Sequence, residues 1–253
     1  MPDEEPQSAA DKTLCVLEAL ADHSRIADIV ASSGLPKATV HRILQTLVRR
    51  GFARTDGQGE YVGGPRILSL AGRFLQRLDL AEQVRPLLRD LQERTAWTVH
   101  LALLSGDEAV YVAKIEGVKP YHLASRVGMS LRLHCTSIGK AILATMPDDE
   151  VRALVRRTGM AARTPNTMTE EDALLRDLTA VRQRGYAEDH EENEAGVRAV
   201  GAAVFDHTGQ VIGGVSAAAL VYHAGEDDPA EVRGELVMRA AEEVSKVLGA
   251  RHG

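Results

Sequence analysis

The segment from 36 to 49 carries polar side chains whose types and spacing suit contacts with DNA bases. Arg42 and Gln45 lie three residues apart, so they share one face of a helix, with Thr39 and His41 on its flanks. Arginine can bond guanine O6 and N7 together, and glutamine can do the same with adenine N6 and N7. We therefore expect Arg42 and Gln45 to contact base edges in the major groove, assisted by Thr39 and His41.

The opposite face of this expected helix is apolar. Aliphatic residues recur on it at i, i+3, i+4 and i+7: Val40, Ile43, Leu44 and Leu47. Ala38 and Arg49 are expected on the same outward face as Arg42 and Gln45. A helical hairpin whose polar face only contacts solvent would give the same pattern. The helix alone therefore leaves open whether this face binds DNA or only contacts water.

Two helices are expected before this segment. Leu14, Leu17 and Leu20 recur at three-residue steps and predict the first helix. Ser24 is the expected N-cap of the second, and Pro36, after a serine-glycine turn, suits the first position of the third.

A short hairpin is expected next. Strand-like residues 51–55 and 60–63 surround the turn signal Asp-Gly-Gln-Gly at 56–59. Three helices followed by a hairpin make a winged helix-turn-helix, a DNA-binding unit. Five side chains of this unit are the expected phosphate contacts: Ser24, Arg25, Lys37, Arg49 and Arg54.

Charge is distributed unevenly along the chain. Its net charge is −6, yet seven Lys and Arg stand against three Asp and Glu between His23 and Arg66. A basic segment on an acidic body suggests that one end meets a polyanion.

At 253 residues, two domains are expected. The acidic N-terminus, the lack of a long apolar run and the presence of only two cysteines predict a cytoplasmic protein that does not enter a membrane.

The rest of the chain mixes helices and strands without regular alternation. This pattern predicts an α+β fold with one sheet covered by helices. Helices are expected at 80–95, 138–146, 148–157, 170–184 and 229–248, and strands at 97–103, 108–116, 198–206 and 211–219.

Two groups could suggest an enzyme. His134, Cys135 and Ser137 could form a nucleophilic site on paper, but no Gly-x-Ser-x-Gly motif accompanies them and apolar neighbours disfavour a thiolate. The acids of 190–194 match no metal-binding spacing, so a solvated acidic loop is expected there. We expect no catalytic residue, metal or cofactor.

Several runs closely resemble the IclR family of bacterial regulators. They are GLPKATVHRIL from Gly34, YVGGPRILSL from Tyr61, HCTSIGKAILA from His134, GYA from Gly185 and VFD from Val204. The resemblance implies a disordered tail (1–10), a winged helix-turn-helix domain (11–64), a linker helix (65–79) and a GAF-like α/β effector-binding domain (80–253). It also implies a homodimer or homotetramer on a double-stranded operator.

A ligand site is expected where residues 136–139 open a helix, because free backbone N–H groups there can bind a carboxylate. The resemblance implies that the backbone of Ser137 and Ile138 holds the effector. It implies side-chain positions at Asp189, Ala199, Ser216 and Ala218, with wall residues Met129, Leu131 and His134.

Two of these positions depart from the family pattern. Family members that respond to very small oxo acids have a cysteine and a second serine where this chain has Ala199 and Ala218. The expected pocket is therefore more apolar and suits a larger or aromatic acid.

The resulting expectation is a DNA-binding regulator, a repressor by family analogy, controlled by a small organic acid. Two alternatives stay open: a C-terminal domain that binds a protein partner, and a hydrolytic enzyme.

Overall fold

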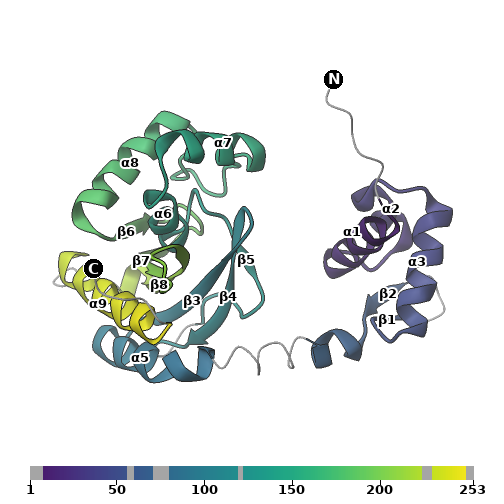
Figure 1. The fold of residues 1–253 in the computed structure, drawn as a ribbon, viewed down its shortest axis with the longest axis horizontal. Helices are drawn as coiled ribbons and strands as arrows, with labels where there is room; N and C mark the ends of the chain where they lie inside the picture. Colours follow the sequence, from purple (N-terminus) through teal and green to yellow (C-terminus); the bar gives the residue numbers. More distant parts are fainter. Residues whose placement is uncertain (1–7, 56–59, 71–79, 119–121, 224–229, 249–253) are drawn as a thin grey trace. The chain divides into compact units, whose positions relative to one another are not determined.

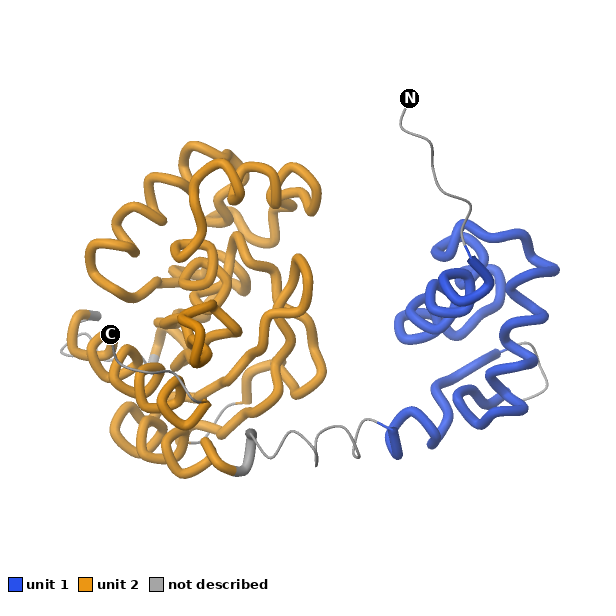
Figure 2. The backbone as a smooth tube through the Cα atoms, viewed as in Figure 1, with its two compact units in different colours: residues 1–79 blue, residues 80–253 orange. Residues whose placement is uncertain are grey.

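The computed structural model of the chain describes residues 8–55, 60–70, 80–118, 122–223 and 230–248. The chain divides into two compact units, residues 1–79 and residues 80–253 (Figure 2). The domain bounds expected from the sequence stay predictions. No described helix combines the length and the apolar composition that a membrane span requires.

The first unit contains three helices and a small hairpin (Figure 1). The helices are α1 (Ala9–Asp22), α2 (Ile26–Ser33) and α3 (Lys37–Arg49), and the strands are β1 (Ala53–Thr55) and β2 (Tyr61–Gly63). The strands pair antiparallel, with Arg54 opposite Val62. The winged helix-turn-helix expected from the sequence is confirmed, although the turn at 56–59 lies outside the described residues.

The core of this unit joins all three helices to the hairpin. It includes the four aliphatic residues predicted to form the inner stripe of α3, all of them buried. On α1 the prediction was partly wrong, because Leu14 is 55% exposed while Val16 and Ala19 are buried.

Three helix starts differ from the expectations. The tail expected to reach residue 10 is already helical at Ala9, because Ser8 and Asp11 form a reciprocal capping box. Arg25, rather than Ser24, is the N-cap of α2, and Pro36 is the N-cap of α3 rather than its first residue. Of the expected linker helix, residues 65–70 are helical. Residues 71–79 lie outside the described part of the chain.

The second unit has a six-stranded antiparallel sheet in the order β5-β4-β3-β8-β7-β6. Its strands are β3 (Thr98–Ser105), β4 (Glu108–Ile115), β5 (Ser130–Leu131), β6 (Ala187–His190), β7 (Val197–Phe205) and β8 (Val211–Leu220). Its helices are α5 (Leu80–Thr95), α6 (Ser137–Ala144), α7 (Asp148–Thr158), α8 (Glu171–Arg184), the 3-10 turn η1 (Val221–His223) and α9 (Ala230–Val247). The α+β fold is confirmed. The two short edge strands β5 and β6 were not predicted.

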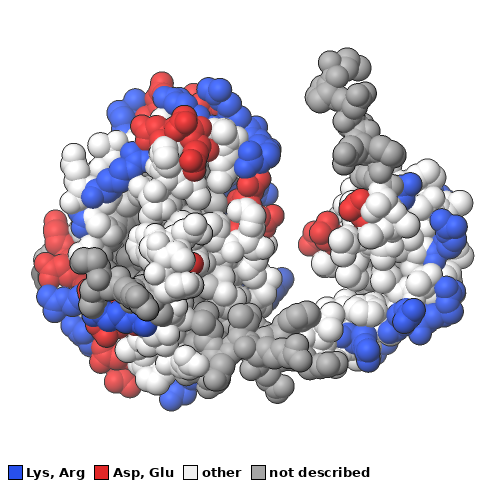
Figure 3. Space-filling model, viewed as in Figure 1, with Lys and Arg blue, Asp and Glu red and all other residues white. Residues whose placement is uncertain are grey.

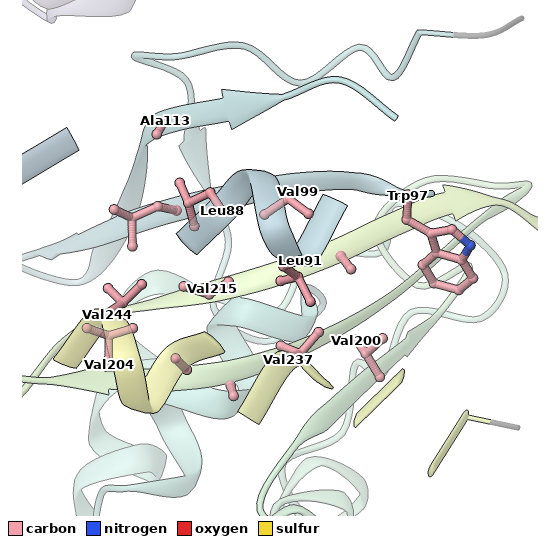
Figure 4. Packing of buried hydrophobic residues seen from close by; sticks show 14 of the residues in the cluster. Leu88, Leu91, Trp97, Val99, Ala113, Val200, Val204, Val215, Val237 and Val244 are labelled. Carbon is pink, nitrogen blue, oxygen red and sulfur yellow. The ribbon is translucent and has the colours of Figure 1, made fainter. Parts of the chain in front are cut away.

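Helices cover both faces of this sheet. Helices α5 and α9 pack on one face (Figure 1). Figure 4 shows Leu88 and Leu91 of α5 and Val237 and Val244 of α9 against valines of the central strands. On the other face α6 lies across β7 and β8, and α8 packs on α6. The second face therefore carries the helix whose start is the expected ligand site.

Candidate functional site

The outward face of α3 is exposed and basic. Lys37, Ala38, His41, Arg42 and Arg49 are all exposed, and Thr39 is half-buried. Figure 3 shows the Lys and Arg atoms of the first unit gathered along the side formed by α3 and the hairpin. Arg54, on β1, is also exposed. The arrangement can present cationic side chains to a groove and its phosphates.

Several of the expected DNA contacts have partners within the unit, among them Arg49, whose Nη2 donates to Thr46 Oγ1 at 2.9 Å. Gln45 is half-buried, and its Nε2 donates to Tyr61 Oη at 3.4 Å, so its side chain faces β2 rather than standing freely on the outer face. The Arg25 guanidinium lies 3.6 Å from a Glu60 carboxylate oxygen. Ser24 is half-buried, and its carbonyl accepts the Tyr61 N–H at 2.7 Å. The centre of the freely exposed polar face is thus at His41 and Arg42.

In the second unit a small cavity lies between the sheet and the start of α6. It encloses about 40 Å³. Six residues expected from the sequence line it: Ser137, Ile138, Asp189, Ala199, Ser216 and Ala218. The start of α6 and the three strands β6, β7 and β8 thus contribute these residues to one place.

The remaining three expected residues line an adjoining, larger hollow. Met129, Leu131 and His134 face a space of about 750 Å³. The hollow shares four lining residues with the small cavity: Tyr111, Ser125, Asn193 and Glu194. The three predicted wall residues therefore line the hollow and not the small cavity. A separate apolar groove of about 610 Å³, beside α8, β7 and α9, holds none of the expected residues.

The N-terminus of α6 provides the positive end of the cavity. Thr136 is its N-cap and accepts the Gly139 N–H at 3.1 Å. In the described structure the backbone N–H groups of Ser137 and Ile138 have no acceptor. Both residues are buried, so these two N–H groups can bind an anion in a site shielded from water.

Asp189 supplies a buried carboxyl group on β6. Its Oδ1 accepts the Glu192 N–H at 2.7 Å and the Asn193 N–H at 3.4 Å. Burial raises the pKa of Asp189 to about 7, against the lowering effect of the Glu192 N–H bond. Near neutral pH this group can therefore donate a proton to an anionic ligand as well as accept one.

His100, Tyr111 and Ser125 are among the polar residues of the cavity that sequence reasoning missed. His100 on β3 is buried, its Nε2 lies 2.8 Å from Ser125 Oγ, and its ring centroid is 4.8 Å from that of Tyr111. Burial, aided by the charge of Lys114, lowers the pKa of His100 to about 3, so the imidazole is neutral. Burial raises the pKa of Tyr111 to about 12. The only signal in the sequence was a histidine within an otherwise apolar strand.

Beside the cavity a buried lysine holds two elements together. Lys140 of α6 lies 2.6 Å from Glu192 and 2.9 Å from Asp177 of α8. Glu192 is only 4% exposed, so the solvated acidic loop expected at 190–194 is wrong for this residue. Because the Glu192 N–H also binds Asp189, the ion pair connects α6 to the cavity wall.

The residues that could have formed a nucleophilic site do not form one. His134 Nε2 bonds the Ala161 carbonyl at 3.2 Å rather than Cys135. Burial raises the pKa of the Cys135 thiol to about 12, which disfavours the reactive thiolate. Within the described ranges no three His, Cys, Asp or Glu side chains are placed to hold a metal ion.

Comparison with known proteins agrees with this geometry in both units. Residues 9–57 match the IclR helix-turn-helix domain, and residues 72–246 match the C-terminal domain described as bacterial transcriptional regulator IclR. The chain is 34% identical over 230 residues to the HTH-type transcriptional regulator XynR of Escherichia coli K12. The match covers 90% of this chain and 91% of that protein.

Solved structures show the same fold. An IclR transcriptional regulator from Alicyclobacillus acidocaldarius superposes with a TM-score of 0.82 at 26% identity, covering 97% of this chain and 100% of that one. An IclR homologue from Microbacterium hydrocarbonoxydans, complexed with 4-hydroxybenzoate, has a TM-score of 0.75 at 25% identity, covering 95% and 99%. The relatives are named as regulators rather than enzymes. This chain belongs to the IclR family of bacterial transcriptional regulators.

Proposed function

We propose that this regulator represses transcription by binding an operator through α3, and that a small carboxylic acid in the cavity beside α6 controls this binding. The observation that carries the ligand proposal is the pair of buried backbone N–H groups at Ser137 and Ile138, which have no acceptor in the described structure and open onto the cavity. A carboxylate would satisfy both.

The proposed DNA contacts follow from exposure and charge. Arg42 and His41 are fully outward on α3, so we assign them to base edges, with Thr39, Ala38 and Gln45 beside them. The Gln45 side chain would have to release Tyr61 Oη to reach a base. The proposed phosphate contacts are those expected from the sequence: Ser24, Arg25, Lys37, Arg49 and Arg54.

The lining of the cavity suggests what kind of acid binds. Asp189 and Ser216 supply polar contacts, whereas Ala199 and Ala218 supply methyl groups only. The enclosed space is too small for a drug-sized ligand, so a larger acid must extend past Tyr111 and Ser125 into the adjoining hollow. The 4-hydroxybenzoate bound by the Microbacterium relative makes an aromatic acid a reasonable first probe.

Control by a ligand requires two states with different affinity for DNA. We propose that two chains place their α3 helices in successive major grooves, about 34 Å apart, as in other dimeric helix-turn-helix proteins. A ligand that favours one arrangement of the second units would change the spacing of the two α3 helices through the linker at 65–79.

A melting-temperature screen against small carboxylic acids, including benzoate and 4-hydroxybenzoate, tests the ligand proposal. A ligand that binds only the folded state raises the melting temperature as its concentration exceeds Kd. The proposal requires that a stabilising acid also changes retention of a promoter fragment in a gel-shift assay. Stabilisation by a co-purified protein, with no response to any acid, would favour the interaction-module alternative instead.

A further inference from the structure

His100 is a buried polar residue in the floor of the cavity that the proposed carboxylate contacts do not use. Its side chain is 2% exposed, and Nε2 is bonded to Ser125 Oγ at 2.8 Å. The other ring nitrogen, Nδ1, is fully buried and has no hydrogen-bond partner in the described part of the chain. Burying a nitrogen atom without a hydrogen-bond partner costs free energy. A ligand that supplies the missing partner would remove this cost.

The sheet places His100 and the start of α6 on the same face, two strands apart. His100 on β3 is directly opposite Ser216 on β8, and Ser216 is opposite Gly201 on β7. Ser137 and Ile138 lie directly over Gly201. Neighbouring strands are about 4.8 Å apart, so the two polar ends are separated by roughly 10 Å at the backbone, with Ser216 between them. One ligand lying over Ser216 can reach both ends.

The two ends differ in charge. The start of α6 carries backbone N–H groups and the positive end of a helix, which favour an anion. The His100 imidazole is neutral, and its neighbours at this end, Tyr111 and Ser125, are also uncharged. Lys114, whose charge acts on His100, has its Nζ occupied by the Leu123 and Ser125 carbonyl oxygens at 2.9 and 2.7 Å and by Glu116 at 2.9 Å. A second carboxylate would therefore not be compensated here, since no lysine or arginine is among the described residues that line this cavity.

We infer that His100, with Ser125, determines effector specificity by hydrogen bonding a hydroxyl group, so that the effector is a hydroxyl-bearing carboxylic acid. A hydroxyl satisfies Nδ1 in either tautomer, because it can both donate and accept. If Ser125 accepts from Nε2, Nδ1 accepts from the ligand hydroxyl. If Ser125 donates to Nε2, Nδ1 donates to it. This inference depends on the proposed carboxylate site beside α6.

Matched acids that differ only in the hydroxyl test the inference. The pairs are 4-hydroxybenzoate with benzoate and 4-hydroxybutyrate with butyrate, each titrated into the full-length protein by calorimetry. The hydroxylated member of at least one pair should bind roughly tenfold or more tightly, because its analogue leaves a buried nitrogen unpaired. Equal affinities within both pairs would overturn the inference while leaving the carboxylate site intact.

Variants separate a specific role for His100 from a structural one. His100→Leu should abolish the preference for the hydroxylated acid of each pair while still binding the acid without the hydroxyl. His100→Gln should restore part of that preference. Ser125→Ala, at a half-buried loop position, should weaken the preference without unfolding the domain, and it serves if His100→Leu does not fold. A full preference retained in both His100→Leu and Ser125→Ala would overturn the inference.

The two proposals fail in distinguishable ways. Gly201→Ala should weaken both members of a pair equally, because it disturbs the carboxylate end alone. If none of the four acids binds the wild-type protein, the carboxylate site is rejected and the hydroxyl inference is rejected with it. If the acids bind but the hydroxyl changes nothing, only the role of His100 is rejected.

Discussion

Gly201 of β7 lies directly beneath Ile138, the second residue of α6. A Cβ atom at position 201 would lie 2.8 Å from the Ile138 backbone nitrogen and 2.7 Å from the Ser137 carbonyl carbon. Atoms this close must move apart, and both are backbone atoms that cannot rotate away. The glycine therefore allows the start of α6 to approach the sheet and close one end of the cavity.

The first prediction follows from this contact. Gly201→Ala should displace the first turn of α6 and weaken binding of any carboxylate effector by roughly tenfold or more, because the two N–H groups no longer converge. Calorimetric titration measures the loss. Gly213→Ala is the matched control: its Cβ would meet the Ala102 carbonyl oxygen in the same sheet, away from the cavity. Equal loss of affinity in both variants would indicate general destabilisation instead.

The second prediction concerns the buried ion pair of α6. Lys140→Met leaves the carboxylates of Glu192 and Asp177 without their cation, and should lower the free energy of unfolding by about 3–5 kcal/mol. Urea denaturation measures this change in the free energy of unfolding. Lys246→Met, which removes a surface lysine paired with Glu242 and Glu243, should lower the free energy of unfolding far less, because solvent screens that pair. A similar small change for Lys140→Met would contradict a role in holding the cavity wall.

The third prediction concerns pH, because His100 and Asp189 respond in opposite directions. Between about pH 6.5 and 3 the unfolded chain protonates His100 and the folded chain does not, so stability falls as pH falls. Between about pH 3.8 and 7 the folded chain keeps the Asp189 proton that the unfolded chain has released, so stability falls as pH rises. Each effect amounts to about 1.4 kcal/mol per pH unit, and the two oppose each other where they overlap.

Single substitutions should reveal how each residue changes the dependence of stability on pH. Relative to the wild type, Asp189→Asn should lose stability as pH is lowered from about 6 to about 4.5, and His100→Gln should gain stability over the same range. Urea unfolding at several pH values measures both. If the three proteins gave parallel curves, neither group could be buried as the structure has it.

The fourth prediction separates base reading from phosphate contact on α3. Arg42→Ala should cost about 1–3 kcal/mol on the operator and much less on random DNA. Lys37→Ala should weaken binding to both and reduce the slope of log K against log salt by roughly 0.9 per lost phosphate contact on each chain. Fluorescence anisotropy over a range of salt concentrations measures both. If Arg42→Ala lost the same affinity for the operator and for random DNA, Arg42 would be a phosphate contact and not a base contact. If Lys37→Ala left the salt dependence of binding unchanged, Lys37 would not be a phosphate contact.

The sequence predicted the elements best where periodicity was strong. The inner stripe of α3 is where the pattern put it, because burial on one side imposes a regular spacing. The two long strands β7 and β8 also lie within one residue of their predicted bounds, because their apolar runs flank the turn residues at 206–209. The short edge strands β5 and β6 were missed, since two to four residues carry too little pattern to be recognised. Leu14 was misplaced because the packing of the neighbouring helices, and not spacing alone, decides which face of α1 is buried.

The cavity was predicted only in part, and the omissions have a physical reason. Ser137, Asp189 and Ser216 were found through family motifs. His100 could not be found this way, because its role depends on the pairing of β3 with β8, which brings it opposite Ser216. Glu192 was expected in solvent, and only the position of Lys140 on the buried side of α6 explains why it is not.

The account depends most on α3 contacting duplex DNA from its exposed face. DNase I footprinting of the purified protein on its own promoter region, at low salt, tests this directly. The account predicts protection of two half-sites one helical turn, or a multiple of it, apart, and loss of that protection in Arg42→Ala at the same concentration. No protected region on this DNA, or the same footprint from the variant, would contradict it.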